Sequence, residues 1–186
     1  MNFDLTSNFD LNELYLIKEI DGYAPEIGRL VSIMKWARAT TLQSVRNLSI
    51  EQLDYLHDDQ SNSIGALLLH IAAIEVSYQV NTFENRGLNS SEQEQWGAAL
   101  ELGDRGRSEI KGRPLSAYIE ILNNVRRKTL DELKKRDDNW LFEVKPFWRN
   151  KPANNYFKWV HVFEDEINHR GQIRIIKKYI PQLESN

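Results

Sequence analysis

Histidine and aspartate side chains recur at a fixed interval near the C-terminal end of the sequence. His161, Asp165 and His169 are each four residues apart, and Gln172 follows three residues later. This spacing places the four side chains along one stripe of an α-helix. Imidazole nitrogens and carboxylate oxygens are suitable ligands for zinc, nickel or iron. The pattern therefore indicates a divalent-metal site on one face of a helix.

A further histidine, His70, lies far upstream in an apolar segment. Leu67 and Ile74 flank it at helical spacing, so His70 stands at the edge of an apolar face and we expect it to point inward. With Asp165 and His169 it would fill three positions of a metal site and leave the others open for water or substrate, as catalytic sites do. An open position of this kind activates a bound water or thiolate.

The same residues have a second interpretation, in which no metal is bound. Semi-buried histidines are usually satisfied by hydrogen bonds, and the three histidines would then form a structural polar network with Asp165. Buried ionisable groups must be paired, hydrogen-bonded or metal-bound to offset the loss of solvation. Both interpretations therefore expect these side chains to meet, and spacing alone leaves both open.

Apolar periodicity predicts the elements that must position these residues. Four long helices are expected, from Pro25 to Leu48, from Ser63 to Phe83, from Pro114 to about Arg136, and from Asn154 or Asn155 to Ile180. Long amphipathic helices without an alternating strand pattern are typical of a bundle. The sequence therefore predicts an all-α fold of the four-helix-bundle type.

Two connections between these helices are expected to be irregular. Residues 86–113 contain five of the nine glycines, which predicts a long loop-rich crossover with a helix around Glu92–Leu102. Residues 137–153 include the aromatic side chains Trp140, Phe142, Phe147 and Trp148. Aromatic side chains on such a loop more often pack against the end of a bundle than bind a ligand.

Charge and composition exclude several classes of partner. The chain of 186 residues has 24 basic and 27 acidic residues, a formal net charge of -3 that gives no attraction to phosphate backbones. Basic residues gather near the end of the last helix, at Arg170, Arg174, Lys177 and Lys178, where we expect a solvated face rather than a DNA-binding surface. There is no cysteine, so any thiol chemistry needs a thiol from outside.

No composition break divides the chain. We therefore expect a single domain over residues 1–186, with about 20 N-terminal residues as a peripheral extension. The first 21 residues carry five acidic side chains and one lysine, unlike a secretory signal. No stretch approaches about 18 uninterrupted apolar residues, so no membrane association is expected. A cytoplasmic location follows as an expectation.

Two segments carry a resemblance to a known family. The segment from His161 to Ile173, ending in His-Arg-Gly-Gln at residues 169–172, resembles the DinB-like superfamily, as does the His-Ile-Ala motif within Leu67–Glu75. The order and the wide separation of the two segments are similar to that family as well. The resemblance extends from Pro25 to Pro181.

This resemblance implies a fold and a ligand set. DinB-like proteins are four-helix bundles, often homodimers, and many hold a divalent metal with one histidine from the second helix and a His-x-x-x-His pair from the last. The pattern corresponds here to His70, Asp165 and His169. Asp165 stands where the common pattern has histidine, and His161, one turn earlier, is a substitute ligand.

The resemblance also implies a reaction. Some DinB-like enzymes use a low-molecular-weight thiol, such as bacillithiol or mycothiol, and the metal activates that thiol. The leading hypothesis is therefore a thiol-dependent S-transferase whose metal-activated thiolate attacks an electrophilic small molecule. The alternative, from another class, is a non-catalytic, stress-related helical homodimer with a structural His/Asp network. A DNA-binding stress protein is disfavoured, because the net charge supplies no basic surface.

Overall fold

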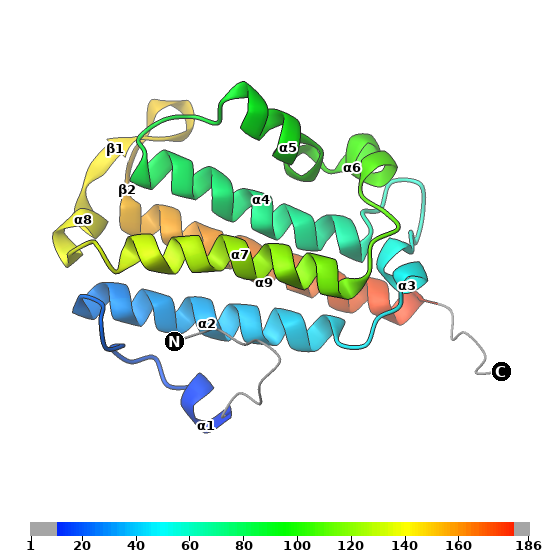
Figure 1. Cartoon of the computed structure of the whole chain (residues 1–186), viewed down its shortest axis with the longest axis horizontal. Coiled ribbons are helices and arrows are strands. Elements are labelled where there is room, and N and C mark those ends of the chain that lie inside the picture. Colours follow the sequence, from blue (N-terminus) through cyan, green and yellow to red (C-terminus); the bar gives the residue numbers. More distant parts are fainter. Residues whose placement is uncertain (1–10, 181–186) are drawn as a thin grey trace.

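The computed structural model describes residues 11–180, and four long helices form its centre (Figure 1). These are α2 (Pro25–Val45), α4 (Ile64–Phe83), α7 (Leu115–Leu133) and α9 (Asn155–Tyr179). Helices α2 and α4 each pack against both α7 and α9, which closes the bundle. The prediction of an all-α four-helix bundle is confirmed.

The connection between α4 and α7 is a crossover. Both helices run in the same direction, because α5 (Ser90–Glu101) and α6 (Gly103–Glu109) lead the chain back along the outside of α4 (Figure 1). The crossover was expected, but the segment is largely helical rather than loop-rich. A capping box between Asn89 and Glu92 begins α5, and positive φ angles at Leu102 (56°) and Gly103 (54°) separate it from α6.

Polar caps set where the ligand-bearing helices begin. The Ser63 side chain accepts a hydrogen bond from the Ala66 amide at 3.1 Å and begins α4, and Asn154 accepts one from the Phe157 amide at 2.8 Å and begins α9. Helix α2 ends at Val45, earlier than predicted. A short helix, α3 (Ile50–Asp54), follows it.

The segment between α7 and α9 contains more structure than expected. It forms the short helix α8 (Asp138–Phe142) and an antiparallel hairpin of β1 (Val144–Pro146) and β2 (Pro152–Asn154), joined by the 3₁₀ turn Trp148–Asn150. Arg149 and Asn150 both have positive φ, as the central residues of a type I′ turn require. These strands are too short for residue alternation to reveal in the sequence.

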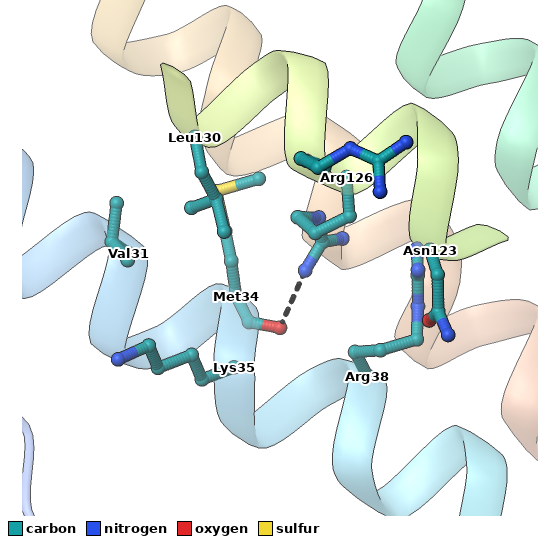
Figure 2. A pocket seen from close by; sticks show the side chains of 8 residues that line it. Val31, Met34, Lys35, Arg38, Asn123, Arg126 and Leu130 are labelled. Carbon is teal, nitrogen blue, oxygen red and sulfur yellow. Dashed lines mark hydrogen bonds between the residues drawn. The ribbon is translucent and has the colours of Figure 1, made fainter. Parts of the chain in front are cut away.

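Four charged side chains lie buried at the centre of the bundle, between two apolar clusters. Arg38 donates to Glu166 at 2.8 Å and to Glu75 at 3.2 Å, while Arg126 donates to Glu75 at 2.7 Å and to Glu166 at 3.1 Å. Each residue comes from a different long helix. Arg126 also donates to the Met34 carbonyl at 2.9 Å, and the adjacent cavity of about 10 Å³ has room for a single water molecule (Figure 2).

The prediction of a solvated basic face at the end of α9 is wrong for part of that face. Arg170 is 6% exposed, lies 4.8 Å from the centre of the Trp36 ring and donates to the Thr40 hydroxyl. Lys177 donates to the Ser44 carbonyl at 2.6 Å. Helix α2 covers this side of α9, so the arginine stem packs against a neighbouring helix instead of water.

Helix α4 and the N-terminal segment test two predictions, the absence of a membrane span and a peripheral N-terminal extension. Helix α4 is apolar and long enough to cross a membrane, but 83% of the relevant window is buried inside the protein, as in a core helix. Residues 1–10 of the predicted N-terminal extension lie outside the described residues. The following helix α1 (Leu11–Leu14) leads into a segment that contacts α2 through a hydrogen bond of 3.0 Å from Ser32 to the Leu16 carbonyl.

Candidate metal centre

Three of the predicted ligands meet between α4 and α9. His70, Asp165 and His169 each offer one ligand atom, and these atoms lie within 4.8 Å of one another. Nε2 of His169 lies 3.4 Å from Oδ1 of Asp165, and Nε2 of His70 lies 3.9 Å from Oδ2. The imidazole rings of His70 and His169 are 4.7 Å apart, edge to face. The cluster therefore has the composition of an open two-histidine, one-carboxylate site.

A contact on the far side of each imidazole fixes its direction. Nδ1 of His70 lies 2.7 Å from the carbonyl oxygen of Ala99 on α5, and Nδ1 of His169 lies 3.1 Å from Oε1 of Gln172. Both partners are acceptors, so each ring in its neutral form donates from Nδ1 and keeps the lone pair of Nε2 for a metal. Metal-binding histidines are held in this way, with the second nitrogen donating to an oxygen.

The carboxylate of Asp165 gives an independent test of whether a cation fits. Its Oδ2 atom is buried and has no hydrogen-bond partner among the described residues. A buried carboxylate oxygen without a donor is costly, and a divalent cation among the three side chains would satisfy it. The side chains of His70, Asp165 and His169 are 10%, 16% and 13% exposed, so the cluster is largely buried but not sealed from solvent.

The two histidines differ in their affinity for protons. Burial lowers the pKa of His70, and the nearby His169 lowers it further. The Ala99 hydrogen bond and the charge of Asp165 act in the opposite direction but do not reverse the shift. Burial also acts to lower the pKa of His169, but the hydrogen bond and charge of Asp165, together with Gln172, raise it overall. His70 is therefore biased toward the neutral form that binds metal, and His169 toward the protonated form, which competes with metal binding.

His161 does not join the other three side chains. Its ring lies one turn before Asp165, stacked 5.8 Å from the ring of Tyr78 and edge to face with Trp148 at 5.2 Å. Its Nδ1 atom is buried and has no hydrogen-bond partner among the described residues. The helical stripe correctly places it beside the cluster, but it faces a neighbouring pocket.

Sequence reasoning missed two contributors to this region. The Ala99 carbonyl that orients His70 is a backbone atom and leaves no signal in the residue types. Tyr78 follows His70 by eight residues, a helical spacing that could have placed it on the same side of α4.

Comparison with known proteins agrees with this architecture. The match to a family model, together with the fold, supports membership of the DinB-like superfamily. A model of the mycothiol-S-transferase family matches residues 29–182, and the chain belongs to that family.

A solved structure supports the fold. The crystal structure of a conserved protein from Enterococcus faecalis is similar to this chain with a TM-score of 0.62 and 15% sequence identity, covering 81% of this chain and 94% of that one. At this identity the likeness bears on the fold alone. None of the curated proteins compared with the sequence matches it.

Proposed function

We propose that this protein is a metal-dependent S-transferase that uses a low-molecular-weight thiol of the mycothiol or bacillithiol type. The observation that carries the proposal is the convergence of three ligand atoms within 4.8 Å, on histidines already oriented from behind. The family supports thiol transfer as the reaction class. The chain has no cysteine, so the sulfur belongs to the cosubstrate.

In this proposal His70, Asp165 and His169 hold a divalent ion of zinc, nickel or iron. When bound, such an ion lowers the pKa of a nearby thiol and favours its thiolate form. Ala99 and Gln172 keep the imidazoles in the required tautomer. Asp165 contributes a single negative charge, so the loaded site keeps a net positive charge that favours an anionic sulfur. The acceptor of that sulfur is an electrophilic small molecule.

Metal content is the first test. Full-length protein purified without an affinity tag is analysed for bound elements, together with Asp165→Ala and His169→Ala variants. The matched control is His57→Ala. His57 is exposed and lies away from the cluster, where its ring stacks on Tyr179 with 4.0 Å between the ring centres. We expect near-stoichiometric metal in the wild type and control, and loss in both ligand variants. Protein that stays metal-free with zinc, nickel or iron(II) would favour the non-catalytic alternative with a structural His/Asp network.

Thiol transfer is the second test. Metal-loaded protein is incubated with mycothiol or bacillithiol and the electrophile 1-chloro-2,4-dinitrobenzene, and the thioether product is quantified. We expect product formation that a chelator abolishes and that restored metal recovers. Metal-loaded protein that accelerates thioether formation with neither thiol would contradict the S-transferase assignment while leaving the metal site intact.

Cellular location and assembly complete the proposal. The DinB-like resemblance implies a homodimer, and the sequence predicts a cytoplasmic location. Light scattering on the full chain is expected to give about twice the chain mass of 21.8 kDa. Fractionation of cells that express the protein is expected to recover it with the cytoplasmic contents.

A further inference from the structure

An open pocket of about 430 Å³ lies beside the candidate metal centre, between α4, α9 and the β1–β2 hairpin. Ile74 and His161 line it, each one helical turn from a predicted ligand, His70 on α4 and Asp165 on α9. The pocket therefore lies one helical turn from the cluster, on the side of the hairpin. A volume of this size suits a small organic molecule.

Two residues that line the pocket carry a polar group without a hydrogen-bond partner. The Tyr78 hydroxyl and Nδ1 of His161 are buried, line the pocket through their side chains and have no hydrogen-bond partner among the described residues. Asn81 accepts a hydrogen bond from Lys158 through Oδ1, which leaves its amide hydrogens to donate. An oxygen-bearing ligand in the pocket would offer an acceptor to the amide hydrogens of Asn81.

Lys158 adds an uncompensated positive charge behind the pocket wall. It is 1% exposed, donates to Asn81 at 3.0 Å and lies 5.4 Å from the centre of the Phe147 ring. Asn81 and Phe147 both line the pocket. Lys158 forms no ion pair with a carboxylate among residues 11–180. A buried ammonium without a counter-ion is costly. Burial lowers the pKa of Lys158, and the charge of Lys145 makes a smaller contribution in the same direction.

Part of the pocket wall is aromatic. The His161 ring lies between Tyr78 and Trp148, and Trp148 stacks on Phe147 at 5.1 Å. The type I′ turn of the hairpin begins at Trp148 and holds it there, although the side chain is 65% exposed. Aromatic faces of this kind pack well against planar groups.

We propose that this pocket binds a planar, unsaturated organic carboxylate. The carboxylate receives hydrogen bonds from the Asn81 amide and is attracted by the ammonium of Lys158, while the planar part lies against His161 and Trp148. That this molecule is the electrophile of the transfer reaction rests on the proposed function. Binding of the carboxylate itself does not, because the pocket contains none of the three predicted metal ligands.

The test uses cinnamate as the probe and cinnamamide as its uncharged counterpart. Binding of each to the full chain is measured by calorimetry, with and without prior metal removal by a chelator. We expect cinnamate to bind at least about tenfold more tightly than cinnamamide, as a charge-assisted contact predicts. The preference should persist in metal-free protein and in a His70→Ala variant. Equal binding of the two probes, or no binding of cinnamate, would overturn the proposal.

Two variants locate the charge that is recognised. Lys158→Met removes the ammonium at similar volume, and Asn81→Asp places an internal carboxylate beside it. Each is expected to weaken cinnamate binding by about tenfold or more and to leave cinnamamide binding unchanged. Lys111→Met, on the exposed connection before α7, is the matched control and should bind like the wild type. Cinnamate binding that survives Asn81→Asp but is lost in His70→Ala would place the carboxylate at the metal centre and refute the pocket.

Discussion

Gln172 lies behind His169, with its Oε1 atom 3.1 Å from Nδ1 of the ring, while Nε2 on the opposite side lies 3.4 Å from Asp165. We predict that Gln172→Leu weakens metal binding about ten- to hundredfold, because the imidazole loses the contact that fixes its tautomer. Asn168→Ala, an exposed amide on the same helix, should bind metal like the wild type. Competition with a chromogenic chelator measures both affinities, and equal values would show that Gln172 does not orient the ligand.

The carboxylate of Asp165 is the feature in which this chain departs from the three-histidine pattern that the DinB-like resemblance implies. We predict that Asp165→Asn, which keeps the shape and removes the charge, weakens zinc binding by more than about tenfold. Asp165→His should retain zinc, because imidazole is a competent ligand at the same position. The same chelator competition measures both variants. Unchanged affinity in Asp165→Asn would mean that the carboxylate is not a ligand.

The buried charge cluster should dominate the response of stability to mutation. Arg126→Met leaves Glu75 and Glu166 short of donors in the interior, and we predict a loss of about 3–5 kcal/mol in the free energy of unfolding. The neighbouring Arg127 is exposed and contacts Asn124 at 2.9 Å, so Arg127→Met should change stability by less than about 0.5 kcal/mol. Urea denaturation compares the two, and equal effects would argue against a structural role for the cluster.

The same cluster predicts a dependence of stability on pH. Burial acts to raise the pKa of Glu75, but the charges of Arg126 and Arg38 and the hydrogen bonds from Arg126 and Thr129 lower it overall. A lowered folded-state pKa gives stability that is present above the ordinary glutamate value of 4.5 and is lost as pH falls through the folded value.

Glu75→Gln tests this dependence directly. The variant should be less stable than the wild type at neutral pH, and the difference should shrink in acid below pH 4.5. Urea unfolding over a pH series measures the difference in unfolding free energy. A difference that stays constant with pH would show that the charge of Glu75 contributes nothing to folding.

Close packing between α4 and α7 gives a prediction about glycine. A Cβ atom at Gly65 would lie 2.5 Å from the hydroxyl of Tyr118, a residue that is 1% exposed. We predict that Gly65→Ala costs about 1–3 kcal/mol despite the better helix propensity of alanine.

Two comparisons isolate that clash. Tyr118→Phe removes the hydroxyl, so the double variant should lose less stability than the two single effects added together. At Gly171 in α9 no atom lies within 4 Å of the added Cβ, and Gly171→Ala should stabilise the protein by up to about 1 kcal/mol. Thermal unfolding of the set measures both effects. Strict additivity in the double variant would exclude the hydroxyl as the source.

Local signals in the sequence predicted the fold and the approximate position of the candidate site. The caps at Ser63 and Asn154 and the spacing of apolar residues located the ligand-bearing helices to within a residue at their starts. The four-residue spacing of Asp165 and His169 required them to share a face in any helix. Because α4 packs against α9, an inward-facing His70 was enough to bring its side chain close to Asp165 and His169.

The remaining features depend on contacts between distant segments. Glu75 is the only acidic residue of α4 and lies between Ile74 and Val76, which indicates a buried partner. The sequence does not say that Arg38 and Arg126 supply it. Arg170 was predicted to lie on the surface, because the sequence of α9 does not indicate that α2 packs over this side of the helix. The pocket at Trp148 likewise depends on a turn whose strands are three residues long.

The buried charge cluster also bears on how such a protein can change during evolution. Each long helix contributes one charged group, so a shift of any helix by one turn would leave a charge unpaired in the interior. The alignment of the bundle is therefore specified by residues that are separate from His70, Asp165 and His169. Substitutions at the ligand positions or in the hairpin can alter the chemistry while the helices stay in register, so the scaffold is free to diversify without being rebuilt.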